Sequence, residues 1–396
     1  MNGAEGLSFL SCRSPDEPGS FEPRSCWSCV RLACGLLVNM VVLIWNLLRL
    51  AIFAALLLPP FLGIACQYYC DARIFHGIRF GPCRRNFVDI YRPVEAVAAR
   101  NNEGPLVPVV VAVMGGAWVI GHRAWNAQLG IRLLDVGVLL VAVDYRNFPC
   151  AQMPDMIDDV CKGVAWVLAN IKTYGGDPDN VILMGQSAGA HLTAMAVIRH
   201  ALAEANFRPN NLFANNNLAL ENGNEDLWSV QSLRGYVGVS GPYDLGMLAR
   251  RCEERGFGSR LLRSFCPNRD LDHYSPLQIV QTSEWNSTVG RLGQSMPPIL
   301  LFHGETDQSV PVDCTTRFAR ALQLSGVSAR ADVRPGVSHT PPIVEGPMRG
   351  EDHQVQLLLP FLLGEEAAQD RFAAMPRLRQ LWPKCIINLA SHVMPF

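Results

Sequence analysis

The sequence predicts an α/β fold, in which helices cover both faces of a mostly parallel β-sheet, preceded by a hydrophobic membrane segment. Three observations support this prediction: short β-branched runs recur along the chain, amphipathic patterns separate them, and a long uncharged stretch precedes them. Strands that alternate with helices build parallel sheets. Such strands are buried on both faces and therefore read as continuous apolar runs.

The N-terminal part of the chain combines a tail, residues 1–31, with an apolar stretch, residues 32–70, in which Arg49 is the one charged side chain. A helix needs about 20 apolar residues to cross the hydrocarbon core. The stretch therefore fits one long tilted span, or two short spans that meet near Arg49, where Pro59 and Pro60 favour a break. A buried hairpin of a soluble domain is the alternative. The run is too long and starts too late for a signal peptide, and arginines on both sides leave the topology open.

Composition narrows the class of protein. Lysine and arginine number 34 against 35 aspartates and glutamates, so no net field attracts nucleic acid. The 13 cysteines are an odd number and crowd toward the N-terminus, which favours reduced thiols that face the cytosol over a disulfide scaffold. Cys26, Cys29 and Cys34 lie beside the apolar stretch, where thiols can be acylated. No second C-x-x-C pair follows, so we expect no metal site.

The strands of the sheet are expected where β-branched residues run without charge. The expected strands are residues 107–116, 137–145, 180–185, 233–241 and 297–304, with a last one within 330–340. Helical patterns lie between them, such as residues 153–174 with an apolar face at helical spacing. Ligands of parallel sheets bind at the carboxyl ends of the strands, so chemistry is expected in the loops that follow them.

One such loop holds a serine between two glycines, in the sequence GQSAG at residues 185–189. A strand, a sharp turn and a helix would lift the Oγ of Ser187 to the top of the sheet, as in the nucleophile elbow of α/β-hydrolases. A serine needs a base and a group that orients the base, and in this fold they follow in the order Ser, Asp or Glu, His. Asp307, with Glu305 as its local competitor, and His339 follow strands in that order.

The other histidines near these motifs have structural explanations. His191 lies one turn into the helix after Ser187, His303 ends a strand, and His353 begins a polar helix. The tetrahedral intermediate also needs backbone N–H donors. Gly116 and Ala117, in the loop after the first strand, and Ala188, after the serine, are placed to provide them.

Several motifs together resemble the isoprenylcysteine alpha-carbonyl methylesterase family. They are GGAW (115–118), DYRNFP (144–149), DMIDDV (155–160), GGDPDNVILMGQSAGAHL (175–192), FHGETDQSVP (302–311), SHT (338–340) and GPMRG (346–350). The resemblance covers residues 85–360 and more loosely the N-terminal region. It implies an α/β-hydrolase domain, which we expect over residues 85–363. Asparagine-rich residues 207–229 interrupt the alternation of strands and helices and are interpreted as a surface insertion. Residues 364–396 are a C-terminal tail with apolar residues near helical spacing, which suits either a membrane surface or the domain.

By position, the resemblance makes Ser187 the nucleophile, His339 the base and Asp307 its orienter, and adds Gly115 to the expected oxyanion hole. Two features depart from the pattern. Met114 stands where many esterases have histidine, and TPPIVEGP follows His339 where an acidic residue is expected directly after the threonine.

The implied reaction removes the methyl ester of a carboxyl-methylated prenylcysteine, with prenylated CaaX proteins as substrates and membrane lipid as partner. No cofactor and no nucleic acid are implied. The expected location is the endoplasmic reticulum or Golgi membrane, with the catalytic domain facing the cytosol. Trp118, Trp125 and Phe148 are candidate walls of a prenyl groove, although each also suits an ordinary core.

Three other functions fit the same residues. A general carboxylesterase or lipase uses the same machinery, because specificity lies in the pocket and not in the fold. An arylformamidase is a close variant that the membrane segment disfavours. A catalytically silent, hydrolase-like interaction protein is the alternative from outside the enzymes, and the complete set of serine, acid and base argues against it.

Overall fold

The computed structural model describes residues 26–204, 228–256, 258–289 and 296–394. Contacts divide the chain into two units, residues 1–45 and 46–396, and the whole sheet lies in the second. The N-terminal tail up to residue 25 and residues 207–227 of the expected insertion lie outside the described residues. The cysteines at 26, 29 and 34 fall on a helix whose side chains there are likewise not described, so their acylation stays a prediction.

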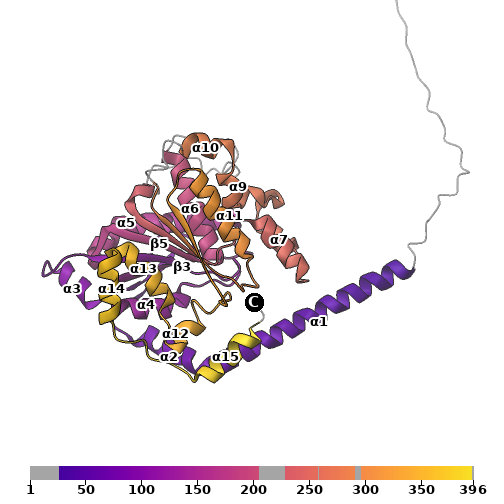
Figure 1. Cartoon of the computed structure of the whole chain (residues 1–396), viewed down its shortest axis with the longest axis horizontal. Helices are drawn as coiled ribbons and strands as arrows, with labels where there is room; N and C mark the ends of the chain where they lie inside the picture. The colour runs from indigo at the N-terminus through magenta and orange to yellow at the C-terminus, as the bar shows by residue number, and fades with distance from the viewer. Residues whose placement is uncertain (1–25, 205–227, 257, 290–295, 395–396) are drawn as a thin grey trace, which may run out of the picture. The chain divides into compact units, whose positions relative to one another are not determined.

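One sheet of eight strands organises the second unit, in the order β1-β2-β4-β3-β5-β6-β7-β8. Figure 1 shows its central strands β3 and β5 with helices around them. Its strands are β1 (Ile74–Arg79), β2 (Phe87–Tyr91), β3 (Val107–Val113), β4 (Leu139–Val143), β5 (Gly176–Gln186), β6 (Leu233–Val239), β7 (Ile299–Gly304) and β8 (Ala329–Arg334). All strand pairs from β4 to β8 are parallel. β1 and β2 are antiparallel additions. The sequence did not reveal these two, because they are short and mix polar with apolar residues, and β1 precedes residue 85.

The β-branched runs form strands because both of their faces are covered by helices. In β3, Val109, Val111 and Val113 pack into the apolar layer that contains α5 and α6, while Val110 and Ala112 pack into the layer that contains α4 and α13. Each of these β3 side chains is at most 1% exposed. Burial of one valine stabilises the fold by about 1.5–3 kcal/mol, so the central strands hold the sheet together.

The helices follow the strands as the alternation predicts. Their bounds after the N-terminal pair are α3 (Val94–Arg100), α4 (Ala127–Leu134), α5 (Met153–Asn170), α6 (Ala188–Glu204), α7 (Leu245–Glu254), α8 (Arg260–Ser264), α9 (Pro276–Val280), α10 (Ser283–Val289), α11 (Val312–Leu324), α12 (Glu345–Arg349), α13 (His353–Leu363), α14 (Glu365–Ala374) and α15 (Lys384–Val393).

The apolar N-terminal stretch forms α1 (Cys26–Leu56) and α2 (Leu58–Cys70). No single helix among the described residues is both long and apolar enough to cross a membrane; a bent pair, Met40–Leu56 with Leu58–Cys70 at 62°, meets the criteria of length and composition. The break falls beside Pro59, because proline fits the first turn of a helix, where no N–H partner is needed. The chain does not break at Arg49, as two spans meeting there would require.

Arg49 instead binds the C-terminal tail. Its Nε and Nη2 donate hydrogen bonds of 2.9 and 3.0 Å to the carbonyl oxygens of Val393 and Met394 at the end of α15. A cation is favoured there by the helix dipole. Ile387 and Ala390 of α15 are fully buried in the apolar layer of α4 and α13. The tail from residue 364 therefore packs on the domain.

Candidate active site

Ser187 lies at the tight turn between β5 and α6 that the sequence predicts. Its φ is +52°, in the left-handed region, and its N–H donates a 2.8 Å hydrogen bond to the carbonyl of Val239. A Cβ at Gly189 would lie 2.1 Å from the Val113 carbonyl oxygen, and one at Gly185 would lie 2.3 Å from Thr193 Oγ1. Only glycines fit these two positions, so the GQSAG spacing gives the turn and exposes the serine hydroxyl above the sheet.

His339 connects Ser187 to Asp307. Its Nε2 lies 3.0 Å from Ser187 Oγ, and its Nδ1 lies 2.6 Å from Asp307 Oδ2. Both contacts are within hydrogen-bond distance. When Nδ1 carries its proton toward Asp307, the lone pair of Nε2 is free to accept the proton of Ser187. Glu305, the competing acid, is exposed. The structure thus brings together the serine, base and acid that the sequence singled out; their roles in catalysis stay predictions.

Asp307 is held by more donors than the sequence suggested. The N–H groups of Ser309 and Val310 donate to Oδ1 at 2.8 and 2.9 Å, and His303 Nε2 lies 3.2 Å from Oδ2. Burial would raise the pKa of Asp307, but His339 and His303 more than offset it and hold that pKa well below its ordinary value. The carboxylate is therefore charged and fixed in orientation.

His303 is a contact that sequence reasoning missed, since it was explained there as a strand end. Its Nδ1 lies 2.6 Å from Thr315 Oγ1 on α11, which can donate its hydroxyl proton to the ring. This bond leaves the Nε2 proton pointing to Asp307 and to the carbonyl of Val310, 3.1 Å away. The spacing of a histidine four residues before the acid, in HGETD, is the sequence signal for this contact.

A second buried carboxylate, that of Glu345 at the start of α12, acts on the base. Burial opposes a charge on His339, but the Asp307 carboxylate outweighs it, so the pKa of His339 lies above its ordinary value, with a smaller contribution from Glu345. Glu345 is fully buried and accepts a 2.9 Å hydrogen bond from Thr340 Oγ1 and a 3.4 Å one from Ser391 Oγ on α15. No acidic residue directly follows the threonine, but the carboxylate of Glu345, five residues later, accepts a hydrogen bond from it.

The loop from Met114 to Gly121, called here the oxyanion loop, lies against the serine. A Cβ at Gly115 would lie 2.7 Å from Ser187 Cβ, so the loop backbone touches the serine directly. Gly116, Ala117 and Trp118 have φ values of +127°, +49° and +60°.

Such conformations store strain and are concentrated at functional sites. On the other side of the serine, Ala188 is the first residue of α6, so its N–H has no partner within the helix. The backbone of Gly115 on one side and the N-terminus of α6 at Ala188 on the other therefore flank the candidate nucleophile, and the use of their N–H groups as an oxyanion hole stays a prediction.

The candidate groove residues differ in exposure. Trp118 is 3% exposed, with its ring centroid 5.3 Å from that of His191 and 5.8 Å from that of Phe265. Phe148 is half-buried, with its ring centroid 5.0 Å from that of Phe265, whereas Trp125 is 48% exposed.

Trp118 and Phe148 therefore belong to one aromatic cluster around Phe265.

His191 is packed as the sequence predicts. Burial lowers its pKa to about 4, and its Nε2 contacts the Tyr274 carbonyl, so it is neutral and bound.

Comparisons with known proteins identify the family of this chain. Residues 88–322 match the BD-FAE family. The isoprenylcysteine alpha-carbonyl methylesterase ICME of Arabidopsis thaliana is 34% identical over 356 residues, which cover 89% of this chain and 77% of that protein. The chain belongs to the isoprenylcysteine alpha-carbonyl methylesterase family. A probable isoprenylcysteine alpha-carbonyl methylesterase ICMEL1 of Oryza sativa subsp. japonica is 33% identical over 352 residues, covering 88% of this chain and 77% of that protein.

Solved structures support the fold alone. The apo form of Thermogutta terrifontis esterase 2 superposes with a TM-score of 0.50 at 18% identity and covers 77% of this chain and 97% of that chain. The family resemblance predicted from the sequence is confirmed, and so is the mostly parallel α/β-hydrolase fold. The methylesterase relatives show that the chain is a carboxylic ester hydrolase.

Proposed function

We propose that this chain is a membrane-associated serine esterase that removes the methyl ester from carboxyl-methylated prenylcysteine. The hydrogen-bonded row from Ser187 through His339 to Asp307 is the observation that carries the mechanism. The methylesterase names of the relatives, which align with 88–89% of this chain, supply the substrate.

The reaction follows from the geometry. As Ser187 Oγ bonds to the ester carbonyl carbon, its proton passes to His339 Nε2, and the carbonyl oxygen takes the negative charge beside the N–H groups of the oxyanion loop and Ala188. The bond to the methoxy oxygen then breaks, and His339 returns the proton so that methanol leaves. Water next gives a proton to His339 as its oxygen bonds to the acyl carbon. The bond from that carbon to Ser187 Oγ then breaks, His339 returns the proton to Oγ, and the product acid leaves and loses its own proton to solvent.

Exposed apolar side chains support a location at lipid. Leu47 and Leu48 on α1, and Leu58 and Leu62 on α2, are between 49% and 60% exposed. Groups of exposed large apolar side chains mark interaction surfaces, and a prenylated CaaX protein presents its lipid at a membrane. We place the enzyme at the endoplasmic reticulum or Golgi membrane, with the catalytic domain toward the cytosol and the aromatic cluster of Trp118, Phe148 and Phe265 as part of the groove.

The test is methanol release from farnesylcysteine methyl ester by membranes that contain the wild-type chain, compared with the Ser187→Ala variant and with an unprenylated cysteine methyl ester. The proposal predicts release that needs both the prenyl group and Ser187. Equal, Ser187-dependent release from both esters would instead show a general carboxylesterase. Release that persists in Ser187→Ala would refute the mechanism.

A further inference from the structure

We propose that the ion pair of Arg85 and Asp144, with Asn147, is a positioning device that fixes the oxyanion loop through the carbonyl oxygen of Gly121. The inference rests on the proposed function, since it assigns a role in the same reaction. It gives a task to Asp144 and Asn147 of the DYRNFP motif at residues 144–149, of which the proposed function uses only Phe148.

Two side chains hold the Gly121 carbonyl. Arg85 Nη2 donates to this oxygen at 2.6 Å, and Asn147 Nδ2 donates at 3.0 Å. Asn147 is buried, whereas the Arg85 side chain is 25% exposed. A carbonyl that accepts two side-chain donors, one of them charged, is fixed in direction as well as in position.

Gly121 in turn fixes the strained end of the oxyanion loop. A Cβ at Gly121 would lie 2.5 Å from the Gly115 carbonyl oxygen, and one at Gly116 would lie 2.4 Å from Gly121 N. The N–H groups of Val119 and Ile120 both donate to the Gly116 carbonyl at 3.0 Å, which closes the turn. Backbone packs on backbone here, so a shift of Gly121 moves the Gly115–Gly116 peptide that faces Ser187.

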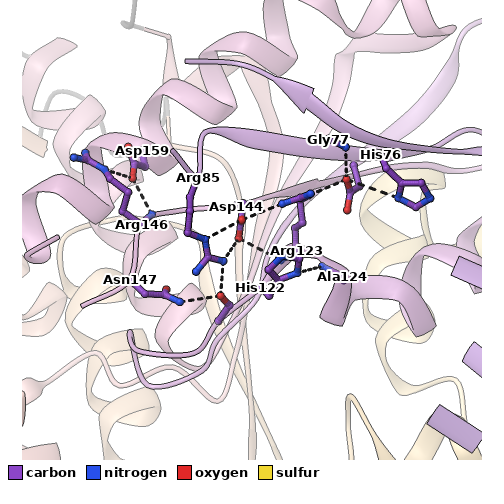
Figure 2. Close-up of polar contacts among 12 residues, drawn as sticks. His76, Gly77, Arg85, His122, Arg123, Ala124, Asp144, Arg146, Asn147 and Asp159 are labelled. Atoms are coloured by element: carbon purple, nitrogen blue, oxygen red, sulfur yellow. Dashed lines mark hydrogen bonds and ion pairs between the residues drawn. The ribbon is translucent and has the colours of Figure 1, made fainter. Parts of the chain in front are cut away.

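The Asp144 carboxylate sets the direction of the Arg85 guanidinium. Arg85 donates to it from two nitrogens, at 2.6 and 3.1 Å, and Arg123 Nη1 adds a third donor at 3.2 Å (Figure 2). Asp144 is 2% exposed. A planar guanidinium that pairs with a carboxylate through Nε and Nη2 has little freedom left, so the second N–H of Nη2 is aimed at Gly121.

The strand order explains why these groups meet. β2 runs antiparallel to β4, so the start of β2, just after Arg85, lies beside the end of β4, just before Asp144. β3, which leads into the oxyanion loop, pairs with the other edge of β4. Arg85, Asp144 and the loop thus come from three adjacent strands at one end of the sheet.

The network continues to α2. Arg123 Nε donates to Asp89 Oδ1 at 2.8 Å, and Tyr68 Oη, on α2, donates to Asp89 Oδ2 at 2.6 Å. The N–H of Gly77 is a further donor to Asp89, at 2.8 Å. The second helix of the apolar N-terminal stretch is therefore joined to the oxyanion loop by an unbroken row of hydrogen bonds. Loss of the Tyr68 hydroxyl is expected to act in the same direction as loss of Arg85, with a smaller effect.

A matched ion pair in the same motif separates positioning from stability. Arg146 pairs with Asp159 at 2.7 Å. The two arginine side chains are similarly exposed, 22% for Arg146 and 25% for Arg85, and so are their carboxylate partners, 1% for Asp159 and 2% for Asp144. Arg146 has no hydrogen bond to Gly121 among those of the described residues. Loss of either arginine leaves a buried carboxylate short of a partner, so a stabilising role alone predicts equal effects for Arg85→Met and Arg146→Met.

The experiment compares wild type, Arg85→Met, Asn147→Ala and Arg146→Met in the full chain. It measures kcat and KM for p-nitrophenyl acetate and farnesylcysteine methyl ester, the melting temperature, and inhibition by a trifluoromethyl ketone, whose adduct with Ser187 carries an oxyanion. Misplacement of a catalytic group by about 1 Å can cost about 100-fold in rate. We expect kcat of Arg85→Met to fall about 10- to 100-fold with KM nearly unchanged, and ketone affinity to fall in parallel.

For Asn147→Ala we expect a smaller loss of the same kind, and for Arg146→Met kcat within about threefold of wild type. Equal losses in Arg85→Met and Arg146→Met, or a loss of kcat with ketone affinity intact, would overturn the inference. If Arg85→Met does not fold, Asn147→Ala decides by the same two readouts. If the wild type hydrolyses p-nitrophenyl acetate through Ser187 but does not hydrolyse the prenylcysteine ester, only the proposed substrate is refuted. The variants still test the positioning device with p-nitrophenyl acetate as substrate.

Discussion

Replacement of Asp307 by asparagine tests whether this residue orients the base, because the surrounding hydrogen bonds fix which way the new amide must point. Because the N–H groups of Ser309 and Val310 both donate to Oδ1, the amide oxygen of an asparagine must take that position. The amide NH2 then faces His339 Nδ1 and His303 Nε2 in the Oδ2 position. His339 must accept from it at Nδ1 and carry its proton on Nε2, where it can no longer accept the proton of Ser187.

The magnitude follows from the cost of the opposite orientation. A flipped amide leaves two backbone N–H groups without acceptors, at about 1–3 kcal/mol each. At the lower limit of about 2 kcal/mol, roughly one molecule in 30 has the productive orientation. In serine proteases the wrong tautomer costs about 10⁴ in kcat, or about 5.4 kcal/mol. We therefore expect a loss in kcat of between about 30-fold and 10⁴-fold, with KM little changed.

The assay is steady-state hydrolysis of p-nitrophenyl acetate, with the melting temperature measured on the same samples. Glu305→Gln is the matched control, because Glu305 lies two residues away and is exposed, and its kcat is expected within about twofold of wild type. An Asp307→Asn variant that folds normally and keeps more than about a tenth of the wild-type kcat would refute the assignment of Asp307 as orienter.

Three further predictions concern the base, the core helix α13 and the oxyanion loop. Because Asp307 raises the pKa of His339 despite its burial, and the base must be neutral, kcat/KM is expected to rise with pH through a pKa above the ordinary histidine value of about 6.5. Glu345→Gln removes a smaller contribution of the same sign, so this limb of the pH–rate profile should move to lower pH; a shift to higher pH would contradict the interaction. Leu358→Ala on α13, at a fully buried position, should cost about 2–5 kcal/mol in urea unfolding, whereas Leu389→Ala on α15, 53% exposed, should cost under about 1 kcal/mol. Gly116→Ala should lose most activity, because an alanine at a φ of +127° would be strained and its Cβ would lie only 2.4 Å from Gly121 N, so the loop must move. A wild-type kcat in this variant would show that the loop conformation is not required.

The sequence alone predicted those parts of this protein that are encoded locally. The runs that became β3 to β7 are apolar and β-branched because both faces of the sheet are covered, and this leaves a continuous pattern in the chain. The GQSAG turn is visible because only glycine fits on either side of Ser187. Asp307 and His339 could be chosen because each follows a strand, and the order of the three residues is characteristic of the fold.

The tertiary structure decided what depends on which strands are neighbours. β1 and β2 join the sheet by antiparallel pairing, and β2 brings Arg85 to Asp144, 59 residues away. No local sequence pattern predicts this pairing, because the residues next to a loop arginine do not differ between one that faces water and one that pairs with a buried carboxylate. His303 and Glu345 are similar cases: their roles come from the folds of other segments around them. The sequence thus determined the fold class and the candidate triad, and only the packing of distant strands and loops determined which charged groups hold that triad and its oxyanion loop in place.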